Sequence, residues 1–420
     1  MATTTSDPAG GSALDGLVVL DLTTGVDGPA CTKYLVDLGA RVIKIEPPGG
    51  DPTRTAEPLV SNGSGSGTDR WSTTFLYLNG GKESVVLDLH SELDRVRLQR
   101  LVRGADLLVE NGRPGELDAL GLGYDSLARL NPALVHLSIS PFGATGPYAG
   151  WQGPDIVLQA LSGWMAQGGS PDREPLRSGG DISLHITAVY AATAALVGIL
   201  SAQQTGQGQH IDVSGLEAMV TTAGQETYRA SVHGADAAWR RIGHATLPTM
   251  LAPCADGWVG INLLYGAHYL TLLELAGMQD VAEDPDFASL AALRASGRAA
   301  ELNERLTAWT RQFGKYELVE RAQALKMSIT AVPTMDEIPT VPQHVARGYI
   351  VEVDHPELGR YRQPGAPYAL SESPCVPPRP APRLGEHAAL HLDAHGETAV
   401  EAGTADGGPA AAPLRAGAAR

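Results

Sequence analysis

An aspartate and a histidine stand four residues apart at the predicted start of a long helix. Asp181 and His185 would share one face of a helix expected over about residues 182–204. A carboxylate can act as a nucleophile or a base, and an imidazole can carry a proton, so this pair has the groups that acyl or proton transfer needs. The alternative is that Asp181 only caps the helix and His185 is an ordinary side chain. A further carboxylate, Asp155, opens a helix predicted over residues 155–167 and could be a base or a cap.

The elements that would position a ligand begin with residues 14–54. An apolar run over residues 18–22 predicts a buried strand, and RVIKIE at residues 41–46 predicts a second. Between them, Gly25 and Gly28 break the chain before a short helix. This is the opening β-α-β unit of a parallel sheet, in which ligands bind beyond the carboxyl ends of the strands.

The glycine turn is compared first with a dinucleotide site. That site would have the pattern G-x-G-x-x-G, with an acidic residue about 20 positions later. Glu46 lies at about that distance, but the turn reads Gly25-Val26-Asp27-Gly28-Pro29 and lacks the glycine pair. A nicotinamide or flavin oxidoreductase therefore stays open only as an alternative.

Strands and helices continue to alternate after the first unit. Strands are predicted at 84–89, 106–110 and 134–140, with helices over 91–103 and around 125–130. This alternation predicts an α/β fold with a Rossmann-like, doubly wound parallel sheet. Later segments predict a hairpin that turns at residues 255–257, then charged helices.

Composition sets the outer limits for a chain of 420 residues. A formal charge of −16 argues against a nucleic-acid surface, which needs clustered Lys and Arg. The three cysteines have neither metal-ligand nor disulfide spacing, so we expect no metal site and a reducing, cytoplasmic location. No signal peptide or membrane span is expected. Residues 1–13 and 391–420 are rich in small and polar residues and are predicted to be disordered.

Several motifs, in order, resemble the class III CoA-transferases, the group of formyl-CoA transferase, carnitine CoA-transferase and α-methylacyl-CoA racemase. The matching segments are LDGLVVLDLTTGVDGPACTKYLVDLGARVIKIE, GGDPTR, LNGGKESVVLDL, ADLLVENGRPG, LGLGYDSLARLNPALVHLSISPFGATGPYA, TGQGQHIDVS, GRAAELNERLTAW, DHPELGRYRQPGAP and LGEH. The resemblance implies an interlocked homodimer, with a large domain built from residues 14–235 and 326–390 and a small domain over 236–325. Coenzyme A (CoA) or an acyl-CoA would be a substrate, with no permanently bound cofactor and a carboxylic acid as the second partner.

The resemblance also implies which residues meet CoA. Those that follow the first, third and fourth strands are Val26, Asp27, Leu87, Asp88, Leu89, His90, Asn111, Gly112 and Arg113, and Lys82, just before the third strand, is added to them. Lys82 and Arg113 would meet its phosphates, or be solvated surface charges. The family often has arginine at the positions of Pro47 and Ala119, which would weaken this phosphate site here.

The family's aspartate nucleophile is absent from its expected position. That position follows a Ser-Gly pair by five residues and precedes the T-G-x-G-Q turn by 21, and both counts reach Leu184. Asp181 is the nearest carboxylate and would be the substitute nucleophile, with His185 as proton carrier. A racemase would use Asp155 and a histidine, but Pro154 occupies the histidine position. The alternatives are therefore an active transferase with relocated residues, a racemase or epimerase, an inactive CoA-binding homologue, and a heteromer in which a paralogue supplies the aspartate.

Overall fold

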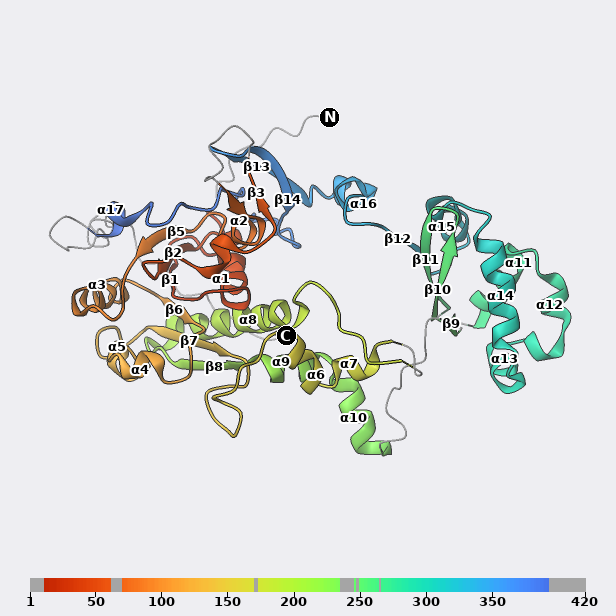
Figure 1. Cartoon of the computed structure of the whole chain (residues 1–420), viewed down its shortest axis with the longest axis horizontal. Coiled ribbons are helices and arrows are strands. Elements are labelled where there is room, and N and C mark those ends of the chain that lie inside the picture. Colours follow the sequence, from red (N-terminus) through yellow and green to blue (C-terminus); the bar gives the residue numbers. More distant parts are fainter. Residues whose placement is uncertain are drawn as a thin grey trace, which may run out of the picture. The chain divides into compact units, whose positions relative to one another are not determined.

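The computed structural model describes residues 11–61, 70–169, 173–234, 245–246, 249–263 and 266–392. They form two compact units. The first contains residues up to 158, residues 179–222 and residues from 351 onward, so it is built from both ends of the chain (Figure 1). The second contains residues 159–178 and 223–350. Its bounds differ from the predicted segment 236–325, and on the C-terminal side the reason is that strand β12 (Ile329–Val332) pairs with β11 (Gly257–Asn262).

The first unit is organised around a six-stranded parallel sheet, which confirms the predicted fold class. Its spatial order is β5-β2-β1-β6-β7-β8. The strands are β1 (Val18–Asp21), β2 (Arg41–Glu46), β5 (Glu83–Val86), β6 (Leu107–Glu110), β7 (Val135–Ser140) and β8 (His210–Ser214). Chain order reverses between β1 and β6, and such a reversal is where open α/β sheets bind ligands.

Alternate residues of each central strand supply two hydrophobic cores. Val19 of β1 packs with helices α1 (Asp27–Asp37) and α8 (Ile182–Thr205) on one face. Leu20, its neighbour, packs on the other face with α3 (Glu92–Val102) and α5 (Tyr124–Ala128). Figure 1 shows these helices around the sheet, and both faces are covered as in a doubly wound fold.

The other elements of the first unit are shorter. They are the 3₁₀ turn η1 (Pro52–Thr55), strands β3 (Leu59–Val60) and β4 (Trp71–Ser72), helices α2 (Thr73–Leu78), α4 (Glu116–Ala119) and α9 (Gly215–Thr222), the hairpin β13 (Ile350–His355) and β14 (Gly359–Pro364), and helix α17 (Ala388–His391). The helix predicted over 155–167 is instead two helices, α6 (Asp155–Leu161) and α7 (Trp164–Gln167). Gly163 has a left-handed backbone (φ 79°) and interrupts the helix between them.

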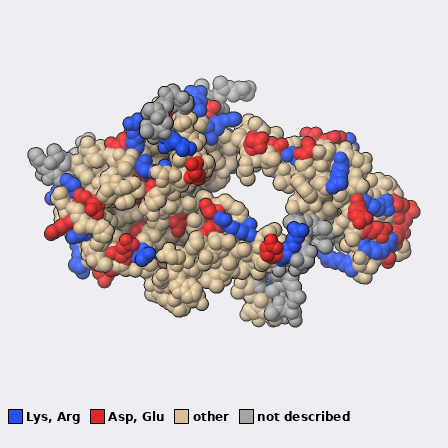
Figure 2. Space-filling view, viewed as in Figure 1, with Lys and Arg blue, Asp and Glu red and all other residues tan. Residues whose placement is uncertain are grey.

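The second unit has an antiparallel sheet in the order β12-β11-β10-β9, packed with helices. Besides α7, its remaining elements are α10 (Gly224–His233), β9 (Ala245–Thr246), β10 (Thr249–Cys254), α11 (Gly266–Leu275), α12 (Gln279–Glu283), η3 (Pro285–Phe287), α13 (Leu290–Ser296), α14 (Ala299–Thr310), α15 (Lys315–Ala324), η4 (Ile338–Thr340) and α16 (Pro342–Ala346). The predicted hairpin is β10–β11. On the face in Figure 2, acidic and basic side chains are interspersed over this unit. Among its ion pairs, Arg298 contacts Asp284 and Glu301.

The end of the described chain packs against the edge strand β5. The backbone N–H groups of Ser84 and His387 donate to His387 Nδ1 (3.2 Å) and Ser84 O (2.9 Å), respectively. His391 is fully buried and its Nε2 lies 2.7 Å from a carboxylate oxygen of Glu83. The predicted disordered tail was therefore assigned too early at residue 391. Residues 393–420 and 1–10 lie outside the described residues.

Helix α8 is long and apolar, with a mean hydropathy of 1.7 over its most apolar stretch. By length and composition it is the one helix among the described residues that could cross a membrane. However, one side of it is buried in the core against α1, β7 and β8. A core helix of this kind passes the same test.

Candidate functional site

A pocket of about 290 Å³ opens at the carboxyl ends of four neighbouring strands of the parallel sheet. Its walls come from segments that follow β1, β2, β5 and β6. The residues lining it are Leu22, Thr24, Ile45, Glu46, Pro47, Leu87, Asp88, Leu89, His90, Glu110, Asn111, Gly112, Glu116, Leu117 and Leu120. The lining combines leucine and isoleucine side chains with a few polar groups, a composition that suits an organic ligand.

The pocket brings together six of the residues predicted to bind CoA. Leu87, Asp88, Leu89 and His90 approach it from the end of β5, while Asn111 and Gly112 approach it from the end of β6. These two segments are separated by 20 residues of sequence, which include helix α3. Because parallel strands end at one edge of the sheet, they meet there.

Val26 and Asp27 lie in the turn between β1 and α1, and Asn111 ties this turn to β6. Asn111 Oδ1 accepts from the N–H of Thr24 (2.9 Å), and its Nδ2 donates to Thr24 O (2.7 Å) and to Asp27 Oδ1 (2.8 Å). Burial raises the pKa of Asp27, against the hydrogen bonds from Gly28 N and Asn111. The side-chain amide of Asn111 is therefore used to hold the turn.

Gly28 allows the two ends of the same turn to touch. A Cβ atom at Gly28 would lie 2.3 Å from the Cβ of Thr23. No side chain fits at that separation, so the close approach requires glycine. The sequence predicted a turn here, and the structure gives the physical reason for its second glycine.

Two cations predicted to meet CoA phosphates lie outside this pocket. The ammonium of Lys82 is fully buried and donates to Asp21 Oδ2 (2.9 Å), Pro29 O (3.0 Å) and Asn79 Oδ1 (2.9 Å). With its donors used inside the protein, we do not retain Lys82 as a phosphate ligand. Arg113 is exposed and lines a neighbouring pocket of about 220 Å³.

Two arginines that sequence reasoning missed support the pocket walls. Arg95 of α3 donates from one guanidinium nitrogen to the carbonyls of Leu89 (3.1 Å) and His90 (3.0 Å). Arg54 forms two 2.7 Å hydrogen bonds with the two oxygens of Glu46, which is buried. Arg95 lies just beyond the LDLH segment, and this proximity was the only sequence signal for its role.

The start of α8 holds the carboxylates considered for catalysis. Asp155 is buried, and its Oδ1 accepts from Ser183 N (3.0 Å) and Ser183 Oγ (2.8 Å). It therefore caps α8, although it is the first residue of α6. Asp181 occupies the N-cap position of α8 with a left-handed backbone (φ 52°), a strained conformation for a residue other than glycine.

Leu184 and His185 lie in the first turn of α8, next to these carboxylates in sequence. Both side chains are half-buried, and the N–H groups of both residues donate to Asp181 O. Burial lowers the pKa of His185, although Asp181 and Asp155 attract a proton to it. A neutral imidazole can accept a proton, so the pair Asp181–His185 keeps the groups that acyl transfer requires. Among the described residues, no cluster of three His, Cys, Asp or Glu side chains suits a metal ion.

Comparisons with known proteins agree with this architecture. Residues 14–388 match the model of CoA-transferase family III. The chain is 33% identical to succinyl-CoA:(R)-benzylsuccinate CoA-transferase subunit BbsE of Thauera aromatica, covering 88% of this chain and 91% of that protein. It is 31% identical to succinate–glutarate CoA-transferase of Agrobacterium fabrum, covering 90% and 94%.

A solved structure shows the same fold. The structure of a CAIB/BAIF family protein from Brucella suis superimposes with a TM-score of 0.80 at 30% identity, covering 90% of this chain and 98% of that one. The family match spans both ends of the first unit and the whole second unit. The chain therefore belongs to CoA-transferase family III.

Proposed function

We propose that this protein transfers CoA from an acyl-CoA to a carboxylic acid, with the adenosine end of CoA in the pocket at the ends of β1, β2, β5 and β6. The observation that carries the proposal is that Leu87–His90 and Asn111–Gly112 converge on this pocket. The named relatives support it, since two of them act on succinyl-CoA or succinate and a second acid by name. In this proposal the donor is the CoA thioester of a carboxylic acid, and the acceptor is a free carboxylic acid.

The reaction needs a carboxylate nucleophile. Its oxygen attacks the thioester carbonyl and expels CoA as the thiolate, leaving a mixed anhydride between enzyme and acyl group. The carboxylate of the acceptor acid then attacks the enzyme's carbonyl carbon in this anhydride and displaces the donor acid as its carboxylate. The CoA thiolate attacks the acceptor's carbonyl carbon in the new anhydride, which forms the product thioester and releases the enzyme carboxylate. We assign the nucleophile to Asp181 and the proton-carrying role to His185, because Leu184 has no reactive group.

Trapping the anhydride tests this assignment. Incubation with an acyl-CoA and hydroxylamine should convert the Asp181 side chain to a hydroxamate, which mass spectrometry detects. The matched control is Asp181→Asn, which should show neither the modified residue nor turnover. An unmodified Asp181 in a protein that still turns over would contradict the assignment.

A second candidate is a subunit whose partner supplies the nucleophile. Leu184 favours it, and the relative from Thauera aromatica is itself named a subunit. Leu184→Asp separates the two possibilities. New transferase activity in this variant, with none in the parent chain, would show that the parent lacks only the nucleophile and depends on another chain for it.

The racemase alternative is less well supported by the contacts of Asp155. Its carboxylate is buried and bonded to Ser183, so it serves as a helix cap. An acyl-CoA that the protein binds can be incubated with it in deuterated water. If its α-proton is not exchanged for deuterium, the racemase alternative is excluded directly.

We also infer a dimer of this chain, in which α8 supplies part of the interface. Val189, Val197 and Leu200 lie on one side of α8 and are 52%, 62% and 55% exposed. Their positions, eight and three residues apart, fall on one face of the helix. An apolar face of this kind on a helix whose opposite side is in the core indicates a protein contact.

The three unpaired cysteines suit a reducing compartment such as the cytoplasm.

A further inference from the structure

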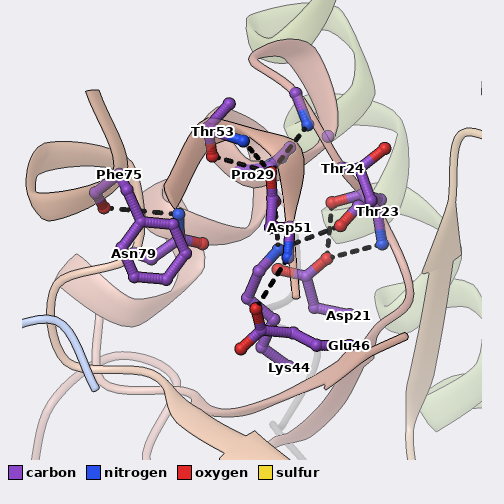
Figure 3. A network of polar contacts seen from close by, with 12 residues as sticks. Asp21, Thr23, Thr24, Pro29, Lys44, Glu46, Asp51, Thr53, Phe75 and Asn79 are labelled. Carbon is purple, nitrogen blue, oxygen red and sulfur yellow. Dashed lines mark hydrogen bonds and ion pairs between the residues drawn. The ribbon is translucent and has the colours of Figure 1, made fainter. Parts of the chain in front are cut away.

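We propose that two buried lysines, Lys44 and Lys82, are positioning residues of the CoA site, because they fix the backbone of the turn between β1 and α1 without touching the ligand. This inference rests on the proposed function. It concerns residues that a ligand in the pocket does not reach, since both lysine side chains are fully buried. Figure 3 shows Lys44 in a polar network with Asp21, Thr23 and Asp51.

Each lysine bonds to one end of the turn. Lys44 Nζ donates to the carbonyl oxygen of Thr23 (2.9 Å), where the turn begins. Lys82 Nζ donates to the carbonyl oxygen of Pro29 (3.0 Å), in the first turn of α1. Lys44 is in β2 and Lys82 is the residue just before β5, so two neighbouring strands of the sheet contribute an ammonium group, one to each end of the turn.

The carboxylates that pair with these lysines hold the same backbone. Asp21 Oδ1 accepts from Thr23 N at 2.9 Å, and Asp51 Oδ1 accepts from Gly25 N at 3.4 Å. Each carboxylate is also 2.9 Å from its lysine, Asp21 from Lys82 and Asp51 from Lys44. In each of the two buried ion pairs, the lysine and the carboxylate therefore both form a hydrogen bond with the backbone of the turn or of the first turn of α1.

A buried ion pair is not the simplest way to stabilise a fold. Well-packed apolar side chains of the same volume are often as stabilising, because the two charges must lose their hydration. The two ion pairs are therefore better explained by the backbone conformation that they specify. Here each ammonium has a backbone carbonyl of the turn as a further acceptor, and it fixes where the N–H groups of that turn point.

The experiment neutralises one pair without leaving an unpaired charge. Asp21→Asn combined with Lys82→Met keeps an oxygen for Thr23 N and removes the donor to Pro29 O. The matched control is Lys33→Met combined with Asp37→Asn. This second pair lies on α1, the helix that follows the turn, with side chains 6% and 17% exposed and a 2.7 Å contact, and none of its hydrogen bonds given above reaches the turn.

Two measurements are made on each purified protein. Hydrogen–deuterium exchange of the free protein should be about tenfold faster in the peptide over residues 22–29 of the Asp21/Lys82 variant, and unchanged in the control. The dissociation constant for acetyl-CoA, by calorimetry, should rise about tenfold in the first variant and stay within about twofold in the control, a difference worth about 1.4 kcal/mol of binding. If the first variant does not fold, Lys44→Met with Asp51→Asn is held to the same criteria.

A folded variant with wild-type exchange in the turn and a wild-type dissociation constant would overturn the proposal. Equal effects in the control pair would also overturn it, because they would show a general loss of stability. The exchange measurement needs no ligand. If the wild-type protein fails to bind acetyl-CoA, the proposed function fails, while faster exchange confined to residues 22–29 would still support the positioning role.

Discussion

Replacing Asp155 separates a structural carboxylate from a catalytic one. The backbone N–H and the hydroxyl of Ser183 both donate to the same carboxylate oxygen, Asp155 Oδ1, and Ser183 is fully buried. Asp155→Ala leaves the buried N–H of Ser183 unsatisfied, while the Ser183 hydroxyl keeps its longer bond to the backbone oxygen of Asp155 (3.3 Å). An unsatisfied buried group costs roughly 1–3 kcal/mol, so we expect a loss of about 2 kcal/mol in unfolding free energy. Asp155→Asn keeps an acceptor oxygen and should lose about 1 kcal/mol, the charged part of the cap.

Urea unfolding measures this difference. The midpoints of the wild type and the two variants, multiplied by a common slope, give the changes in unfolding free energy. Transferase and α-proton exchange assays are run on the same samples. A loss of stability as large in Asp155→Asn as in Asp155→Ala would refute the capping argument. A stable Asp155→Asn protein that has lost all catalysis would show instead that the carboxylate acts as a base.

Three further predictions test other parts of the first unit. Gly28→Ala should lower the unfolding free energy by about 2 kcal/mol and weaken acetyl-CoA binding, because its Cβ would lie 2.3 Å from the Cβ of Thr23. The control is Gly49→Ala, which has open space around it and should change neither the melting temperature nor the affinity measured by calorimetry. Burial opposes ionisation of Glu83, but hydrogen bonds from His391 and Arg41 hold its pKa at about 2. Its ionised form should therefore contribute roughly 3 kcal/mol to the unfolding free energy above about pH 4.5, and this contribution is lost as the pH falls toward 2. Glu83→Gln should therefore flatten the fall in melting temperature between pH 5 and pH 3, and an unchanged slope would contradict the assignment. Val197→Asp should convert a dimer to a monomer in light scattering with the fold intact by circular dichroism, and a monomeric wild type would remove the basis for the α8 interface.

The sequence was sufficient for the sheet because its strands are short apolar runs. Residues 18–22, 41–46 and 134–140 were each predicted within one or two residues of β1, β2 and β7. The glycine turn and the convergence of Leu87–His90 with Asn111 also follow from strand order, since the carboxyl ends of parallel strands share an edge.

The roles of buried charges could not be predicted in the same way. In the sequence, Lys82 was compatible with a surface cation. In the fold its ammonium is buried among three acceptors, the most distant of which, Asp21, lies 61 residues before it in the sequence. Asp155 reads as the cap of its own helix, but caps one that begins 27 residues later. Such partners depend on three-dimensional proximity, which periodicity and spacing do not contain. The reaction also stays a proposal, because the nucleophile position holds Leu184.

The contact between β5 and the C-terminal segment has a consequence for how the chain is made. Ser84 bonds to His387 across 303 residues, and Arg54 bonds to Pro382 across 328. On the ribosome, the N-terminal strands are complete long before these partners are synthesised, so β5 is an open sheet edge until residues 382–391 have been made. An open edge can pair with another chain. Expression vectors that truncate the protein before residue 382 should therefore yield aggregates, whereas those ending after residue 392 retain every contact described at this edge.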